Sequence, residues 1–214
     1  MKLRTVGGAA MALTAWLVPT AVDAHRVDEY LQATRLSIDR AQVGIEISLT
    51  PGVDVAPTIF RSIDADGNGR ISQAEGAAYA RQVLSSVALA VDAHPVPVAF
   101  VEEHFPEYRD MQLGMGTIRL RGLATISTSA AGHHQLEYRN AHRPDASVYL
   151  VNVLVPSDRR IQIGPQRRDA AQHWLRVEYD VGSERSPASA AWLLAGGALL
   201  GGLAATRRSV TPKI

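Results

Sequence analysis

The twelve residues from Asp64 to Glu75 constrain this chain more than any other stretch. Their sequence is Asp-Ala-Asp-Gly-Asn-Gly-Arg-Ile-Ser-Gln-Ala-Glu, which places side-chain oxygens at positions 1, 3, 5, 9 and 12. Gly67 and Gly69 permit the positive φ angles of a sharp turn, and Ile71 offers an apolar side chain to a core. Calcium binds six to eight oxygens in a flexible geometry. The spacing therefore predicts a cation-binding loop; an Asp- and Gly-rich surface turn that binds nothing is the alternative.

Apolar residues recur at helical spacing on both sides of this loop, which predicts two flanking helices. Asp54 is the expected N-cap of the first helix, and Pro57 lies in its first turn, where proline is tolerated. The apolar positions before the loop are Val55, Ile59, Phe60 and Ile63, and those after it are Ala80, Val83, Leu84 and Val87.

This helix–loop–helix pattern resembles the EF-hand family of calcium-binding proteins over residues 54–86. The resemblance implies Ca²⁺ as the cofactor. It also implies six ligands, which are Asp64, Asp66, Asn68, the backbone carbonyl of Arg70, Ser72 and Glu75.

Two features depart from the EF-hand pattern. EF-hands usually occur in pairs, but the sequence holds no second loop of this kind, so this hand must pack on another part of the chain. The loop carries only three carboxylates, and affinity in such loops follows ligand charge and rigidity. We therefore expect a weak site of roughly 0.1–1 mM, which suits a structural calcium ion outside the cytosol.

The amino-terminal residues have the pattern of a signal peptide. A basic start precedes a short apolar run that ends at Pro19, and small residues precede a cut between Ala24 and His25. Residues 1–24 are the predicted signal peptide; an uncleaved membrane anchor is the alternative. Because the chain has no cysteine, the exported part must rely on a hydrophobic core and not on disulfides.

Residues 188–206 are nineteen uncharged residues followed by Arg207 and Arg208. About twenty apolar residues span the hydrocarbon core of a bilayer, so this segment is a predicted transmembrane helix; a buried core helix is the alternative. The positive-inside rule places the tail, residues 207–214, in the cytoplasm and the preceding domain outside it. The layout also resembles bacterial C-terminal sorting tags, some of which are cleaved, although no diagnostic motif precedes the helix.

Residues 25–187 form the predicted exported domain, which is long enough for one core of its own. Their 17 arginines and 20 acidic residues give a formal net charge of −3, which gives no indication of nucleic-acid binding.

Short segments of alternating hydrophobicity predict the strands of this domain. Residues 36–38 and 43–49 flank a turn and predict one hairpin, which Pro51 and Gly52 close; residues 87–91 and 96–100 predict a second. Further strands are expected at 117–128, 135–139, 148–155, 160–163 and 173–181, with a loop at 102–116. The predicted fold class is mainly β, antiparallel and sandwich-like, with the helix–loop–helix inserted at 54–86 and one C-terminal transmembrane helix.

The order of these segments is similar to that of a periplasmic β-domain found with bacterial nickel-permease-like accessory proteins of hydrogenase and urease. The similarity rests on residues 25–31, the first hairpin, the Pro51-Gly52 turn and residues 153–157. It makes a membrane or periplasmic protein a possible partner and assigns no functional residue.

The histidines form a second candidate site. After cleavage, His25 would be the first residue, and its amine and ring nitrogen can chelate copper, nickel or zinc if another histidine joins them. Six other histidines could join His25, but their spacing is not that of metal ligands. They are His94, His104, His133, His134, His142 and His173. His133 and His134 are predicted in an exposed turn.

Motifs of catalysis are missing from the sequence, which has no Gly-x-Ser-x-Gly elbow, phosphate loop, cysteine nucleophile or His-Glu-x-x-His helix. The sequence therefore predicts an exported, membrane-anchored calcium-binding protein and not an enzyme. A periplasmic protein that binds or delivers a transition metal through His25 is the alternative.

Overall fold

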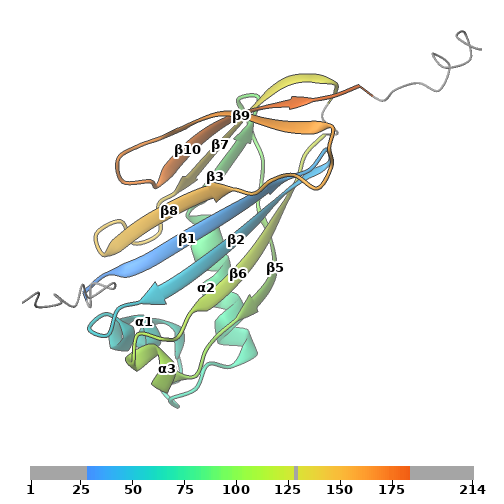
Figure 1. The fold of residues 1–214 in the computed structure, drawn as a ribbon. Helices are drawn as coiled ribbons and strands as arrows, with labels where there is room; N and C mark the ends of the chain where they lie inside the picture. The colour runs from blue at the N-terminus through green and yellow to red at the C-terminus, as the bar shows by residue number, and fades with distance from the viewer. Residues whose placement is uncertain (1–27, 128–129, 184–214) are drawn as a thin grey trace, which may run out of the picture.

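The computed structural model describes residues 28–127 and 130–183. The predicted signal peptide, His25, the predicted transmembrane segment 188–206 and the tail 207–214 lie outside these residues. Across the described ranges, no helix combines the length and the apolar character needed to cross a bilayer. The described residues are mainly β, as the alternating segments predict, and form two five-stranded sheets (Figure 1).

The first sheet has the strand order β5-β6-β2-β1-β8. Its strands are β1 (Tyr30–Ile38), β2 (Gln42–Pro51), β5 (Ala99–His104), β6 (Ile118–Thr125) and β8 (Ser147–Val153). The pairings are antiparallel except that of β1 with β8, which is parallel. β1 and β2 form the first predicted hairpin, with Leu36 opposite Ile45 and Ile38 opposite Val43.

The second sheet has the order β4-β3-β7-β10-β9, and all its pairings are antiparallel. Its strands are β3 (Val87–Val91), β4 (His94–Pro95), β7 (Gly132–Asn140), β9 (Ile161–Arg168) and β10 (Trp174–Val181).

The two sheets share one hydrophobic core. Alternate side chains of β2, such as Ile45 and Ile47, and of β10, such as Val177 and Tyr179, are buried in the same cluster. A hydrogen bond of 2.8 Å between the hydroxyls of Thr34 and Tyr138 joins β1 to β7 across this core. The sheets therefore pack face to face, and burial of both inner faces stabilises a chain that has no disulfide.

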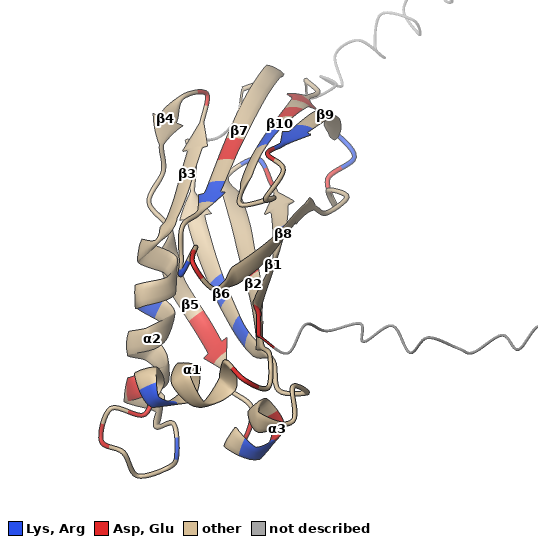
Figure 2. Ribbon diagram, turned by 90° about the vertical axis from the view of Figure 1, so that its left-hand side faces the viewer, with Lys and Arg blue, Asp and Glu red and all other residues tan. Residues whose placement is uncertain are grey.

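Two helices connect the sheets. α1 (Ala56–Ile63) and α2 (Gln73–Ser85) follow β2 and precede β3, and α3 (Tyr108–Gln112) lies between β5 and β6. All three helices lie at one end of the molecule (Figures 1 and 2). The apolar face predicted for α1 is buried, and α2 buries Tyr79, Ala80, Val83 and Leu84.

The helix boundaries correct two predictions. Val55, and not Asp54, is the N-cap of α1, and no side chain caps this helix; Pro57 does lie in the first turn. A backbone hydrogen bond from Val55 to Gly52 holds the turn after β2, so the chain enters α1 without a capping side chain. α2 ends at Ser85, and Val87 begins β3 instead of the last helical turn.

The second predicted hairpin is wrong in its later half. Only the two residues of β4 pair back on β3, and the chain then crosses to the first sheet as β5. Residues 102–116, predicted as a loop, contain the end of β5 and all of α3. A register shift between Phe100 and Glu102 interrupts the alternation of β5, and five residues are too few for α3 to show a helical period.

Candidate metal centre

The loop between α1 and α2 is folded by its own carboxylates. Asp64 follows the last residue of α1, and its two carboxylate oxygens accept hydrogen bonds from the backbone N–H groups of Asn68 at 3.1 Å and Gly69 at 2.9 Å. Asp66 accepts from the same Asn68 N–H at 3.1 Å. Gly67 and Gly69 have φ angles of 69° and 78°, which residues with a Cβ rarely adopt. The glycine spacing therefore has the conformational role that the sequence predicts.

Glu75 closes the loop from the first turn of α2. Its Oε1 accepts from the backbone N–H of Ala65 at 2.7 Å, and its Oε2 accepts from the N–H of Ser72 at 2.9 Å. Ser72 is the N-cap of α2, so Ser72 and Glu75 together form a capping box. One glutamate thus links the beginning of the loop to the helix that follows it.

Three predicted ligands come together at one point. The carboxylates of Asp64, Asp66 and Glu75 each offer an oxygen, and these oxygens all lie within 4.8 Å of one another. The Asn68 amide donates to Asp66 Oδ2 at 2.7 Å, and the Ser72 hydroxyl donates to Glu75 Oε2 at 2.7 Å. The side chains of Asn68 and Ser72 thus contact the acidic group.

The hydrogen bonds around Glu75 keep its carboxylate charged. The backbone and hydroxyl donors of Ser72, followed by the N–H groups of Asp66 and Ala65, lower the pKa of Glu75 to about 2. A carboxylate that stays ionised well below neutral pH is a suitable ligand for a hard cation.

The segment Phe105–Tyr108 packs against the two helices that flank the loop. The rings of Tyr108 and Phe60 lie 3.9 Å apart, and those of Phe105 and Tyr79 lie 6.2 Å apart. Ile71 is half-buried and packs against the core. The α1–loop–α2 segment therefore rests on α3 and β5, which provide the packing partner that it lacks as a single helix–loop–helix.

No protein-family model matches this chain, and a search of curated proteins finds no match to it. The functional interpretation therefore rests on the geometry of the site and on the sequence.

We expect the substitution Ser72→Ala to lower the free energy of unfolding of the metal-free protein by about 1 kcal/mol, because it removes the N-cap of α2. Urea unfolding in the presence of a chelator measures this change. The exposed Ser157, which lies outside every helix, supplies a matched control, and Ser157→Ala should leave the unfolding midpoint unchanged. Equal midpoints for all three proteins would contradict a capping role of Ser72.

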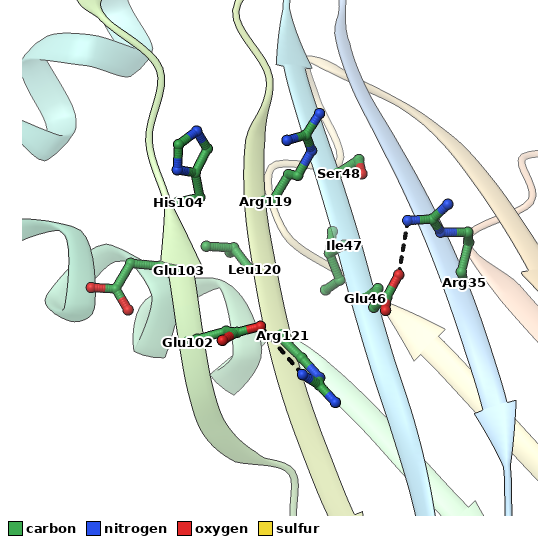
Figure 3. A pocket seen from close by; sticks show the side chains of 10 residues that line it. All are labelled: Arg35, Glu46, Ile47, Ser48, Glu102, Glu103, His104, Arg119, Leu120 and Arg121. Carbon is green, nitrogen blue, oxygen red and sulfur yellow. Dashed lines mark hydrogen bonds and ion pairs between the residues drawn. The ribbon is translucent and has the colours of Figure 1, made fainter.

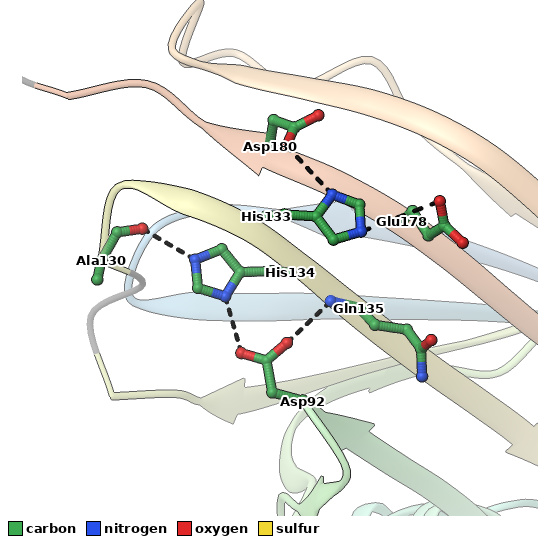
Figure 4. Close-up of polar contacts among 7 residues, drawn as sticks. All are labelled: Asp92, Ala130, His133, His134, Gln135, Glu178 and Asp180. Atoms are coloured by element: carbon green, nitrogen blue, oxygen red, sulfur yellow. Dashed lines mark hydrogen bonds and ion pairs between the residues drawn. The ribbon is translucent and has the colours of Figure 1, made fainter.

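The described histidines are scattered, and three of them, His133, His134 and His173, pair with acids. His133 and His134 lie on strand β7 and not in the predicted turn, although His133 is exposed as predicted. Figure 4 shows that His133 faces Asp180, at 3.2 Å, whereas His134 contacts Asp92 at 2.7 Å. Among the described residues, the three acids of the loop are the group whose ligand atoms converge, and no histidine joins such a group.

The outer face of the first sheet has a shallow depression of about 460 Å³ (Figure 3). Arg35 pairs with Glu46 at 2.8 Å on one side of it, and Arg121 pairs with Glu102 at 3.3 Å on the other. These pairs are exposed and contribute little to stability. The depression is thus lined largely by charges that neutralise one another.

A buried polar network joins the helices to the sheets, and sequence reasoning missed it. The Tyr79 hydroxyl on α2 lies 2.9 Å from the hydroxyl of Tyr30 on β1 and 3.2 Å from His142 Nε2. Asn140 donates to Gln32 at 2.9 Å, and Gln32 donates to the His142 carbonyl at 2.8 Å. The available signal was Gln32, a polar residue at an inward-facing position of an otherwise alternating strand.

Proposed function

We propose that this protein binds Ca²⁺ through a single EF-hand-type loop and that the bound ion holds the α1–α2 insertion in place on the β domain. The observation that carries the proposal is the convergence of the Asp64, Asp66 and Glu75 carboxylates within 4.8 Å. Loop glycines with positive φ and a helix on each side support it further. The resemblance to EF-hands over residues 54–86 fits the same function.

Electrostatics explain how an ion would act on the loop. Three carboxylates at this separation repel one another, and a divalent cation converts that repulsion into attraction. We expect Asn68, the Arg70 carbonyl and Ser72 to complete the ligand set, and Glu75 to bind through both oxygens. Magnesium requires a small and nearly ideal octahedron, so it should replace calcium poorly.

The membrane part of the proposal rests on the sequence. Export by residues 1–24 and anchoring by residues 188–206 would place the β domain on the outer side of the membrane, where calcium is plentiful. The proposed function is therefore binding and structural organisation, and not catalysis. Delivery of copper, nickel or zinc through His25 remains the competing hypothesis, and the transition-metal content of the purified chain would distinguish the two.

Calorimetric titration of the full chain in detergent tests the calcium site. Calcium should bind with one-to-one stoichiometry, and magnesium at the same concentration should give little heat. Asp66→Asn removes one of the three converging charges and should weaken calcium binding at least about tenfold, a loss of about 1.4 kcal/mol.

Asp28→Asn is the matched control, since Asp28 is exposed and lies outside the loop, and it should bind calcium like the unsubstituted chain. Equal calcium affinity in Asp66→Asn would show that the binding site lies elsewhere. Absence of any calcium-dependent heat would refute the proposed function.

A further inference from the structure

The chain leaves the described domain at one end of the sandwich. β10 ends at Val181, and the N–H of Gly182 donates to the carbonyl of Arg160 at 2.7 Å. Only residues 184–187 separate the last described residue, Ser183, from the uncharged segment that begins at residue 188. Four residues reach at most roughly 14 Å even when fully extended. A bilayer that holds the segment must therefore lie close to this end of the domain.

This end carries the most exposed large apolar side chain of the described residues. Val155 is 94% exposed, and its neighbour Leu154 is 39% exposed. Both belong to the connection between β8 and β9, and β9 begins with Ile161, which pairs with Val181. The β8–β9 connection therefore lies at the end of the domain where the chain leaves β10. Transfer of such an exposed valine side chain from water into an apolar phase is favourable.

The connection that carries the projecting valine also carries two arginines. Arg159 and Arg160 are exposed four and five residues further along the same connection. Asp158 accepts from Arg160 at 2.7 Å, so Arg159 is the cation of this connection that stands outside that ion pair. Asp39 lines the same hollow as Leu154 and Val155. An apolar tip on a connection that carries Arg159 is suited to a phospholipid surface, where the valine side chain enters the acyl boundary and the guanidinium meets a phosphate group.

We propose that this end of the sandwich, formed by the β8–β9 connection and the end of β10, docks on anionic phospholipid with Val155 inserted. The inference rests on the proposed membrane anchor. It also orients the molecule, because the helices lie at the opposite end (Figure 1) and the ten residues of β2 span roughly 33 Å between the ends. The calcium loop would then face away from the membrane.

The chain has no cysteine, so single cysteines can carry a probe without competing sites. The full chain is reconstituted into vesicles of phosphatidylcholine and phosphatidylglycerol, with an environment-sensitive fluorophore on Val155→Cys. Met115→Cys is the matched control, because Met115 is 69% exposed and adjoins α3 at the opposite end. We expect a blue-shifted emission and quenching by lipid-borne nitroxides at position 155, and neither effect at position 115.

Each further outcome decides one part of the inference. Arg159→Glu should reduce the quenching at position 155, and unchanged quenching would overturn the role of the cations. A chain that floats with the vesicles while the probe at 155 stays in water would overturn docking but leave the anchor intact. A chain that does not float would overturn both. Calcium titration of the same vesicles reports the calcium site independently of all three results.

Discussion

Calcium at a hundredfold excess over its dissociation constant is expected to raise the free energy of unfolding by about 2.7 kcal/mol. The proposed ion would bind the folded loop, where the carboxylates of Asp64, Asp66 and Glu75 converge, because the unfolded chain does not hold these groups together. For a domain of this size the gain corresponds to a rise in melting temperature of roughly 5–10 °C. Calorimetric melting of the full chain in calcium and in chelator measures it.

Glu75→Gln should abolish most of this calcium-dependent rise, because it removes one of the three charges and the bidentate carboxylate. The metal-free variant should also be less stable, since an amide cannot accept from Ala65 and Ser72 with both of its polar atoms. The relevant quantity is therefore the difference in melting temperature between calcium and chelator for each protein. Glu107→Gln, at an exposed position whose side chain makes no capping bond, should retain the full difference.

Melting curves that coincide in calcium and chelator for the unsubstituted chain would contradict the proposed role of the ion. A full calcium-dependent rise in Glu75→Gln would contradict the assignment of Glu75 as a ligand.

Local patterns explain what could be predicted. The β1–β2 hairpin follows from strict alternation, because a strand with one buried face must repeat its apolar residues every second position. The loop follows from the spacing of Asp64, Asp66 and Glu75 together with its glycines, since both the turn and the positions of the three carboxylates are local properties of twelve residues. Such features need no knowledge of which strands become neighbours.

Contacts between distant segments explain what could not be predicted. β8 lies beside β1 in parallel, and β3 and β5 belong to different sheets, although alternation alone suggests simple hairpins. Nothing in the sequence around His142 distinguishes it from the exposed histidines. Its burial depends on Tyr30 and Tyr79, which come from a strand and a helix far away in the chain. Burial of this kind is decided by tertiary packing, which single-sequence patterns do not encode.

His142 should make the protein less stable in mild acid. Its side chain is 4% exposed, and its Nε2 lies 3.2 Å from the hydroxyl of Tyr79. Burial, and secondly the positive charge of Arg143, lower the pKa of His142 to about 4. The titratable groups that face it are the hydroxyls of Tyr79 and Tyr30, which stay neutral in this range.

The sign of the effect follows from the lowered pKa. Unfolded His142 takes up a proton near pH 6.5 and the folded form near pH 4, so protons favour the unfolded state between these values. The stabilising contribution is complete above pH 6.5 and is lost as the pH falls toward 4. Protonation of His142 should lower the free energy of unfolding by on the order of 3 kcal/mol in total. Most of this decrease should have occurred by pH 4.5.

Urea unfolding of the unsubstituted chain and of His142→Gln at pH 7 and pH 4.5 isolates this contribution. The substitution should lower stability at pH 7, because it disturbs the buried network, yet the variant should lose roughly 2 kcal/mol less between the two pH values than the unsubstituted chain. His104→Gln, at an exposed position on β5, should keep the pH dependence of the unsubstituted chain. If His142→Gln instead lost as much stability on acidification as the unsubstituted chain, the histidine that joins α2 to the sheets would not be the acid-sensitive group.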